Sequence, residues 1–236
     1  MTQKILFTRE HPLDEELRER LERHSFEVCH LPLITCQANP LPEWVLQRLP
    51  QADWLFFTSA VAVDFFAPYI GDKTRIATIG HQTSKAVQAL GHTIDFESTY
   101  QYATEFAKEW LDLKLVRQSI LLPQSSLSNP VLADTLRKYG HDVIAWPLYD
   151  TKPNPVSQKK IGQYLLEENV LWTYASPSAW QSFYEVCPRL PETHQIAVIG
   201  TSTAKAVLET GQVVHLMPDS PSVENMVEDI IRKRRK

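Results

Sequence analysis

The sequence predicts an α/β fold of the doubly wound class, in which helices cover both faces of parallel sheets. Short apolar runs rich in β-branched residues alternate with segments of helical periodicity. The stretch RIATIGHQTSKAVQALG (75–91) recurs as QIAVIGTSTAKAVLETG (195–211), with nine of seventeen positions identical at an offset of 120. The duplication extends along the whole chain, which indicates two halves of similar structure.

Three further pairs of segments continue the repeat. The chain begins with KILFTREHPLDEELRERLERHSFEVCHLPLITC, which is matched by SILLPQSSLSNPVLADTLRKYGHDVIAWPLYDT at an offset of 115. DWLFFTSAVAVDFF (53–66) is matched by VLWTYASPSAWQSF (170–183) at an offset of 117, and STYQYATEFAKEWL (98–111) resembles DSPSVENMVEDII (219–231). Each half is therefore expected to run strand, helix, strand, long connection, strand, helix, strand, helix, strand, helix.

The individual elements follow from local patterns. We expect strands at 5–8, 26–30, 54–58, 76–79 and 93–96, with counterparts in the second half. Apolar residues at helical spacing predict helices through Leu13, Leu17 and Leu21; through Val63, Phe66 and Ile70; and through Val131, Leu132, Leu136 and Tyr139. Gly91, Gly140 and Gly211 are expected at helix C-termini.

Two extended segments, 30–40 and 145–155, occupy equivalent places in the repeat and suggest how the chain divides into domains. If the chain crosses between domains at both, one domain is 38–148, the other is 1–34 plus 152–236, and the linkers are 35–37 and 149–151. A single cut near residue 116, which follows the repeat itself, is the alternative. The pattern of residues favours neither division.

Composition restricts the classes of partner. Of the 236 residues, 43% are hydrophobic and 22% charged, and the net charge is −4, so we expect no nucleic-acid partner. No apolar run is long enough to cross a bilayer, and the start MTQKILFTRE lacks the features of a signal peptide, so we expect a cytoplasmic protein without membrane association. The three cysteines and eight histidines show no metal-ligand spacing, so no metal is expected.

Small hydroxyl residues and glycines follow the predicted strands, where parallel sheets bind their ligands. Each group precedes a helix, whose unpaired N–H groups and dipole favour carboxylates or phosphates. Serine and threonine are also ordinary helix N-caps, but both halves place them at the same points. The candidate binding residues are Thr58, Ser59, Gly80, Thr83, Ser176, Ser178, Gly200, Thr203 and Ser222.

Nucleotide and hydrolase motifs are missing, whereas one tyrosine breaks the symmetry of the repeat. The sequence contains no GxGxxG, GxxxxGK[ST] or GxSxG motif, which disfavours dinucleotides, P-loop nucleotides and a serine hydrolase. Tyr149 lies in PLYDT, where the first half has PLITC. Its phenol either packs in the fold or, if it faces a cleft, donates a proton to a leaving group.

The order of these motifs resembles the uroporphyrinogen-III synthase family over nearly the whole chain. The similar parts are the paired TS and IGxxT turns, PLY in the second crossing segment, and SPSA and IGTSTAKAV near the end. The resemblance implies two flavodoxin-like domains joined by a two-stranded β-ladder, which selects the discontinuous division. It also implies a cofactor-free hydro-lyase of haem biosynthesis that closes hydroxymethylbilane, with loss of water and inversion of the last pyrrole ring, into uroporphyrinogen III. We expect a monomer whose partner is this small-molecule substrate.

The resemblance also assigns roles to residues of this chain. It implies that Tyr149 is catalytic and that Thr83 and Thr203 bind substrate; the family's TS and SPS turns fall on Ser59, Ser176 and Ser178, and Arg9 is retained in TREHP. The chain departs from the family at Val61, where Asn is common, and at Pro123-Gln124, where Arg-Gly is common. These departures affect individual carboxylate contacts.

Two other functions could be considered for a sequence with these features. A two-domain hinge protein that binds a small polyanionic ligand without chemistry explains the duplicated turns equally well, but it has no particular use for Tyr149. A duplicated response-regulator module is excluded because no acidic cluster follows the first strand.

Overall fold

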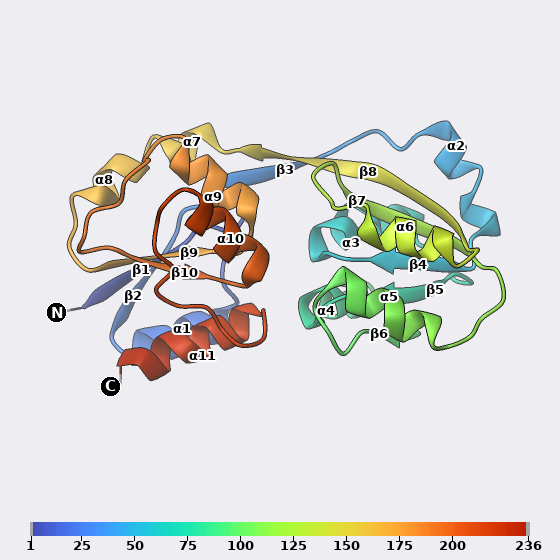
Figure 1. The fold of residues 1–236 in the computed structure, drawn as a ribbon, viewed down its shortest axis with the longest axis horizontal. Helices are drawn as coiled ribbons and strands as arrows, with labels where there is room; N and C mark the ends of the chain where they lie inside the picture. Colours follow the sequence, from blue (N-terminus) through green and yellow to red (C-terminus); the bar gives the residue numbers. More distant parts are fainter. Residues whose placement is uncertain (1, 235–236) are drawn as a thin grey trace. The chain divides into compact units, whose positions relative to one another are not determined.

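The structure is a computed structural model that describes residues 2–234. The chain forms two compact units: unit 1 runs to Thr35 and resumes at Lys152, and unit 2 is Cys36–Thr151. In each unit, helices lie on both sides of a sheet (Figure 1). The long apolar runs of the sequence form these strands because both faces of each sheet are covered.

Unit 1 is built on a parallel sheet with the strand order β10-β9-β1-β2. Its elements in chain order are β1 (Gln3–Phe7), α1 (Glu15–Arg23), β2 (Phe26–His30), α7 (Pro155–Gln158), α8 (Ile161–Leu165), β9 (Val170–Tyr174), α9 (Pro177–Tyr184), β10 (Gln195–Val198), α10 (Thr201–Glu209) and α11 (Val223–Arg234). Helices α1 and α11 cover one face of the sheet through Leu21 and Val227. Helices α8, α9 and α10 cover the other, where Trp180 and Val207 pack on Trp172 and its neighbours.

Unit 2 contains the strands β8-β7-β4-β5-β6 in this order, where β8 is Asp142–Pro153, and β3 (Ile34–Ala38) lies beside β8. Its elements are α2 (Glu43–Leu46), η1 (Leu49–Gln51), β4 (Trp54–Phe57), α3 (Ala60–Phe66), η2 (Ala67–Tyr69), β5 (Arg75–Thr78), α4 (His81–Ala89), β6 (Phe96–Glu97), α5 (Ala103–Leu111), β7 (Ser119–Ser125) and α6 (Val131–Lys138). Helices α5 and α6 contribute Phe106 and Leu136 to the core on one face. Helices α2, α3 and α4 contribute Val45, Phe66 and Val87 to the other.

The two sheets carry matched strands in the same order. By the sequence repeat, β7 corresponds to β1, β8 to β2, β4 to β9 and β5 to β10, so β8-β7-β4-β5 repeats β2-β1-β9-β10. An isolated parallel bridge between Ala197 and Leu216 takes the place that β6 has in unit 2. The predicted α/β class with parallel sheets is confirmed.

Two strands carry the chain from one unit to the other. The unit boundaries fall inside β3 (Ile34–Ala38) and β8 (Asp142–Pro153), which are neighbours in one sheet. Asn39 N donates to Leu148 O at 2.8 Å, and Asn154 N donates to Leu33 O at 2.9 Å. Because residue numbers rise along one strand as they fall along the other, this pair is antiparallel.

Two predicted elements are shorter than the apolar pattern indicated. The strand expected at 93–96 is only Phe96–Glu97, because Ile76 N donates to the Asp95 carboxylate at 2.8 Å and the side chain thus replaces a backbone acceptor of the ladder. The helix expected to reach Ile70 ends at Phe66 and continues as the short 3-10 helix η2, because Pro68 cannot donate a helical hydrogen bond.

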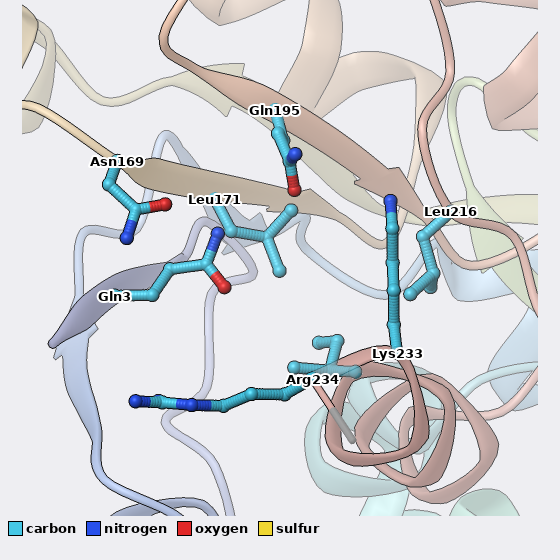
Figure 2. Close-up of a pocket in the computed structure, with 8 residues that line it drawn as sticks. Gln3, Asn169, Leu171, Gln195, Leu216, Lys233 and Arg234 are labelled. Carbon is cyan, nitrogen blue, oxygen red and sulfur yellow. The ribbon is translucent and has the colours of Figure 1, made fainter. Parts of the chain in front are cut away.

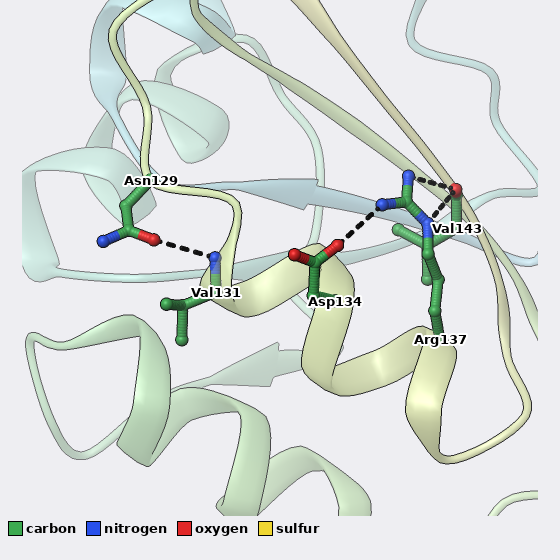
Figure 3. Close-up of polar contacts among 5 residues, drawn as sticks. All are labelled: Asn129, Val131, Asp134, Arg137 and Val143. Atoms are coloured by element: carbon green, nitrogen blue, oxygen red, sulfur yellow. Dashed lines mark hydrogen bonds and ion pairs between the residues drawn. The ribbon is translucent and has the colours of Figure 1, made fainter.

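Helix α6 is fastened at both ends beside the strand that carries Tyr149 (Figure 3). Asn129 Oδ1 accepts a hydrogen bond from Val131 N at 2.9 Å, and the Arg137 guanidinium donates to Val143 O at 2.9 and 3.2 Å and to Asp134 at 3.1 Å. Gly140, with φ +89°, lets the chain turn from α6 into β8, as predicted, and Gly91 and Gly211 adopt the same left-handed conformation. These contacts hold the start of β8 against its neighbouring helix.

Buried His141 makes the stability of unit 2 depend on pH. It is 8% exposed, its Nδ1 accepts a hydrogen bond from Gln118 N at 3.2 Å, and burial lowers its pKa. The folded pKa thus lies below the unfolded value of about 6.5, so the histidine is neutral in both states above that pH. Below it, the unfolded chain takes up the proton first, and stability falls as the pH falls towards the folded pKa.

We expect His141→Asn, whose side-chain oxygen can accept the same hydrogen bond, to lose less thermal stability than the wild type between pH 7.5 and pH 5. Melting temperatures measured across this range test the prediction. His11→Asn, at an exposed histidine, is the control and is expected to keep the wild-type slope. Equal slopes for all three proteins would contradict a role for His141.

Candidate functional site

In unit 2, the predicted binding turns lie side by side at the carboxyl edge of the sheet. Strands β4 and β5 are paired, with Phe57 opposite Thr78, so the turns that follow them adjoin. Thr58 leads into Ser59, which caps α3 by accepting a hydrogen bond from Ala62 N at 3.1 Å. The second turn contains Gly80 and Thr83 at the start of α4.

Tyr149 lies at this same edge and contacts the first turn. Its Oη is 3.1 Å from Ser59 Oγ, its ring packs at 5.7 Å from the ring of Phe65, and it is 6% exposed. An irregularity between Gln124 and Ser125 shifts the register of β7 against β8 just where Ser125 pairs with Tyr149. Such bulges redirect side chains at the ends of strands. The structure therefore brings together two residues that the sequence had proposed separately.

The second turn of unit 2 combines a glycine in the left-handed region with buried hydroxyls. Gly80 has φ +86°, a conformation that favours glycine, and Thr83 is 4% exposed within the first turn of α4. Ser84 Oγ is 2.7 Å from Thr78 Oγ1 and so ties the helix to the end of β5. Ser84 has a structural partner, which leaves Thr83 as the better candidate for a ligand.

In unit 1, the turns after β9 and β10 repeat this arrangement without the phenol. Ser176 accepts a hydrogen bond from Ala179 N at 3.2 Å and lies 3.0 Å from Ser178 Oγ. The next turn begins at Gly200, whose φ of −177° is ordinary extended backbone. Thr203 follows it; its side chain is fully buried, and its Oγ1 has no hydrogen-bond partner among the described residues.

Two further predicted residues of unit 1 lie in the loop that follows β1 and in the loop that precedes α11. Arg9 follows β1, the neighbour of β9, and its guanidinium is half-buried. Burial lowers the pKa of Arg9, against the opposing effect of the carboxylates of Asp14 and Glu224, and the guanidinium still carries its charge because arginine is effectively always protonated in proteins. Ser222 Oγ accepts a hydrogen bond from Asn225 N at 3.0 Å in the first turn of α11.

One residue of the unit 2 site was not foreseen from the sequence. Gln101, in the loop between β6 and α5, places its side-chain oxygen 2.5 Å from the point where a Cβ on Gly80 would lie. The sequence repeat gives a signal that could have identified Gln101. The offset of 120 that pairs Gly80 with Gly200 also pairs Gln101 with Pro221. A carboxamide thus replaces a proline at this point of the repeat.

One pocket of unit 1 lies away from these turns (Figure 2). It has a volume of about 280 Å³ and is found at the amino ends of the strands, on the opposite edge of the sheet. Figure 2 shows Lys233 extending from α11 towards Leu216, and its Nζ donates to His215 O at 3.2 Å. None of the predicted site residues is among the described residues that line this pocket. These are Gln3, Asn169, Leu171, Gln195, Leu216, Ile230, Lys233 and Arg234.

The described residues, 2–234, contain neither a cluster of metal ligands nor a helix suited to a membrane. No group of three or more His, Cys, Asp or Glu side chains in this range is placed to hold a metal ion. Over the same range, no helix combines the length and apolar character that a membrane span requires.

The fold and these turns define a class of protein: a duplicated parallel α/β protein that presents hydroxyl-rich helix N-termini at the carboxyl edges of its sheets. The family model described as uroporphyrinogen-III synthase HemD matches residues 15–228. The chain belongs to the uroporphyrinogen-III synthase family.

Individual relatives carry the same description. The chain is 24% identical to the uroporphyrinogen-III synthase of Chlorobaculum parvum over 97% of this chain and 99% of that protein. It is also 24% identical to the chloroplastic uroporphyrinogen-III synthase of Oryza sativa subsp. japonica, over 98% of this chain and 80% of that protein. The crystal structure of uroporphyrinogen-III synthetase from Helicobacter pylori is similar in fold, with a TM-score of 0.69 at 17% identity, covering 99% of this chain and 100% of that one.

Proposed function

We propose that this protein is a uroporphyrinogen-III synthase, a hydro-lyase that closes hydroxymethylbilane into uroporphyrinogen III with inversion of the terminal pyrrole ring. Family membership over residues 15–228 supports the reaction. The observation in the chain itself that carries the proposal is the contact of Tyr149 with Ser59, because it places a phenol at a helix N-terminus suited to anions. A protein that only binds a polyanion would not need this phenol, and the named relatives do not favour that alternative.

The turns of both units are proposed to hold the acetate and propionate arms of the substrate. In each unit, serine and threonine hydroxyls lie just before or within the first turn of a helix, beside the unpaired backbone N–H groups of that turn. These donors can bind carboxylates without dense positive charge. Arg9 adds a single cation in unit 1. The predicted contacts are those of Thr58, Ser59, Gly80 and Thr83 in unit 2, and of Arg9, Ser176, Ser178, Gly200, Thr203 and Ser222 in unit 1.

Tyr149 is proposed to donate the proton that leaves with the substrate hydroxyl as water. Ser59 Oγ already accepts a hydrogen bond from Ala62 N, and its own proton can then point to the phenol oxygen. In that arrangement the phenol proton points away from Ser59, and this is the proton that we propose passes to the leaving hydroxyl. Ring inversion is a matter of positioning: the bound chain must bring the substituted carbon of its last ring to the reacting carbon.

The domain arrangement is part of the same proposal. We propose that the protein has two flavodoxin-like domains, one formed by 1–34 together with 152–236 and the other by 38–148. Residues 35–37 and 149–151 then form a two-stranded β-ladder that links them. We also propose that the protein works in the cytoplasm as a monomer and without a cofactor. Sedimentation of the purified protein tests the monomer, and a stable dimer would contradict it.

Incubation of the purified protein with freshly prepared hydroxymethylbilane, followed by separation of uroporphyrin isomers I and III, tests the proposed function. The spontaneous reaction is expected to give isomer I, and added protein is expected to direct the product to isomer III in proportion to its concentration. Protein that binds the substrate but leaves the isomer ratio unchanged would support the binding protein instead.

The hydroxyl of Thr203 provides a second test, because no residue in the described range 2–234 gives it a hydrogen-bond partner. Thr203→Val removes the hydroxyl and retains the shape, so we expect an unchanged or higher melting temperature and a KM raised about 3- to 10-fold, as for one lost hydrogen bond to a carboxylate. Thr203→Ser keeps the hydroxyl and is expected to retain the wild-type KM. A wild-type KM in Thr203→Val would mean that this threonine only fills the core. The KM values of Thr83→Val and Thr83→Ser test the corresponding threonine of unit 2 in the same way.

A further inference from the structure

Gln101 is held against the backbone at the N-terminus of α4 in unit 2. Its Oε1 lies 2.5 Å, and its Nε2 4.0 Å, from the point where a Cβ on Gly80 would be. A Cβ on Gly80 would make the flexible Gln101 side chain move, and Gly80 is also in the left-handed region, with φ +86°, which favours glycine. Gly80 therefore serves two purposes: it allows the turn and it admits the carboxamide of Gln101.

The loop that carries Gln101 is fastened by other residues. Ser98 Oγ donates to the Glu109 carboxylate at 2.6 Å, Thr99 N donates to the same carboxylate at 2.9 Å, and Tyr100 N donates to Ser98 Oγ at 3.2 Å. Gln101 itself is half-buried and makes no side-chain hydrogen bond with another residue in the range 2–234. The fold therefore positions this carboxamide without using its donors.

The corresponding place in unit 1 is built differently. The offset of 120 places Pro221 opposite Gln101, and a proline side chain has no donor. The matching Gly200 has φ −177°, so its turn lacks the left-handed conformation of Gly80. Arg9 belongs to unit 1, whereas in unit 2 the carboxamide of Gln101 lies at the turn that begins α4, a helix that also carries Lys85.

We propose that Gln101 is a further substrate-binding residue, whose Nε2–H₂ group donates to a substrate carboxylate held at the first turn of α4. This inference rests on the proposed synthase function. With Oε1 against Gly80, the amide nitrogen is the group left for a ligand, and the fastened loop means that little conformational freedom is lost when it binds.

The test compares steady-state kinetics with hydroxymethylbilane for three variants. Gln101→Leu removes the donors at similar size, and Gln101→Glu keeps the shape but places a negative charge beside the bound carboxylate. Gln88→Glu makes the same charge change at an exposed position further along α4 and is the control. Melting temperatures of all variants distinguish a binding role from a structural one.

We expect KM to rise about tenfold in Gln101→Leu and more in Gln101→Glu, with kcat within about twofold of the wild type and melting temperatures unchanged. Gln88→Glu is expected to match the wild type. KM values in the Gln101 variants equal to that of Gln88→Glu would overturn the inference, as would a fall in melting temperature that parallels the rise in KM. A wild-type protein that forms no uroporphyrinogen III would instead contradict the proposed function, and this inference with it.

Discussion

Replacing Tyr149 by Phe is expected to slow the formation of uroporphyrinogen III by up to about 10²-fold, towards the lower end of what a positioned general acid contributes. The change removes the donor and keeps the ring that packs against Phe65. It also removes the contact with Ser59, which nevertheless keeps its hydrogen bond from Ala62 N. The folded structure should therefore persist, with a melting temperature close to that of the wild type.

The distribution of isomers separates proton donation from positioning in this variant. Product that the Phe variant still forms should be isomer III, and isomer I should increase only as the spontaneous reaction overtakes the slower enzyme. Ser59→Ala, which removes the partner but keeps the phenol, is expected to slow the reaction less than Tyr149→Phe does. Wild-type turnover by the Phe variant would remove Tyr149 from the mechanism. Isomer I that scales with enzyme concentration would show that the phenol also directs ring inversion.

Phe56→Ala is expected to cost about 3–5 kcal/mol of folding free energy, which is a large part of the stability of an ordinary domain. Phe56 is fully buried in β4, and its ring lies 5.1 Å from that of Phe106 and 5.2 Å from that of Trp110 in edge-to-face geometry. Removal of the ring leaves a cavity between the sheet and α5 that rigid neighbours cannot fill. Urea denaturation measures the loss.

Hydrogen exchange shows where the Phe56 variant loses stability. Because each unit has its own core, amides of β4, β5 and β7 should lose protection while those of β1, β9 and β10 retain it. Val116→Ala, at a residue that is 81% exposed, is the control and is expected to unfold like the wild type. A loss of less than about 1 kcal/mol would contradict the predicted packing role, and equal loss of protection in both sheets would show that the two cores unfold together.

The strand and helix pattern was predictable because it depends on local sequence. Apolar runs such as 54–57 and the periodicity of 131–138 are local patterns of neighbouring residues, and the repeat shows most of these patterns twice. The errors fell where a single side chain or backbone nitrogen outweighed the pattern. Asp95 replaced a ladder acceptor beside β6, and Pro68 ended the helical hydrogen bonding of α3.

The candidate site was predictable in its residue types and less so in its contacts. Helix N-terminal serines, threonines and glycines can be found from sequence because capping is local, and Ser59 and Ser176 do cap α3 and α9. The sequence could not show that Thr203 Oγ1 lacks a partner or that Ser84 has one in Thr78. Those differences depend on which side chains the neighbouring elements bring near.

By itself, the sequence determined the parallel α/β class, the duplication and the places of the hydroxyl-bearing turns that precede helices, since periodicity, capping and self-similarity are properties of adjacent residues. Only the tertiary structure decided that Tyr149 meets Ser59, ninety residues away in the chain, and that Gln101 lies on Gly80. Such contacts depend on the pairing order of the strands and on a local irregularity between β7 and β8. The free energy that selects them comes from burying two whole cores, so no short stretch of sequence encodes them.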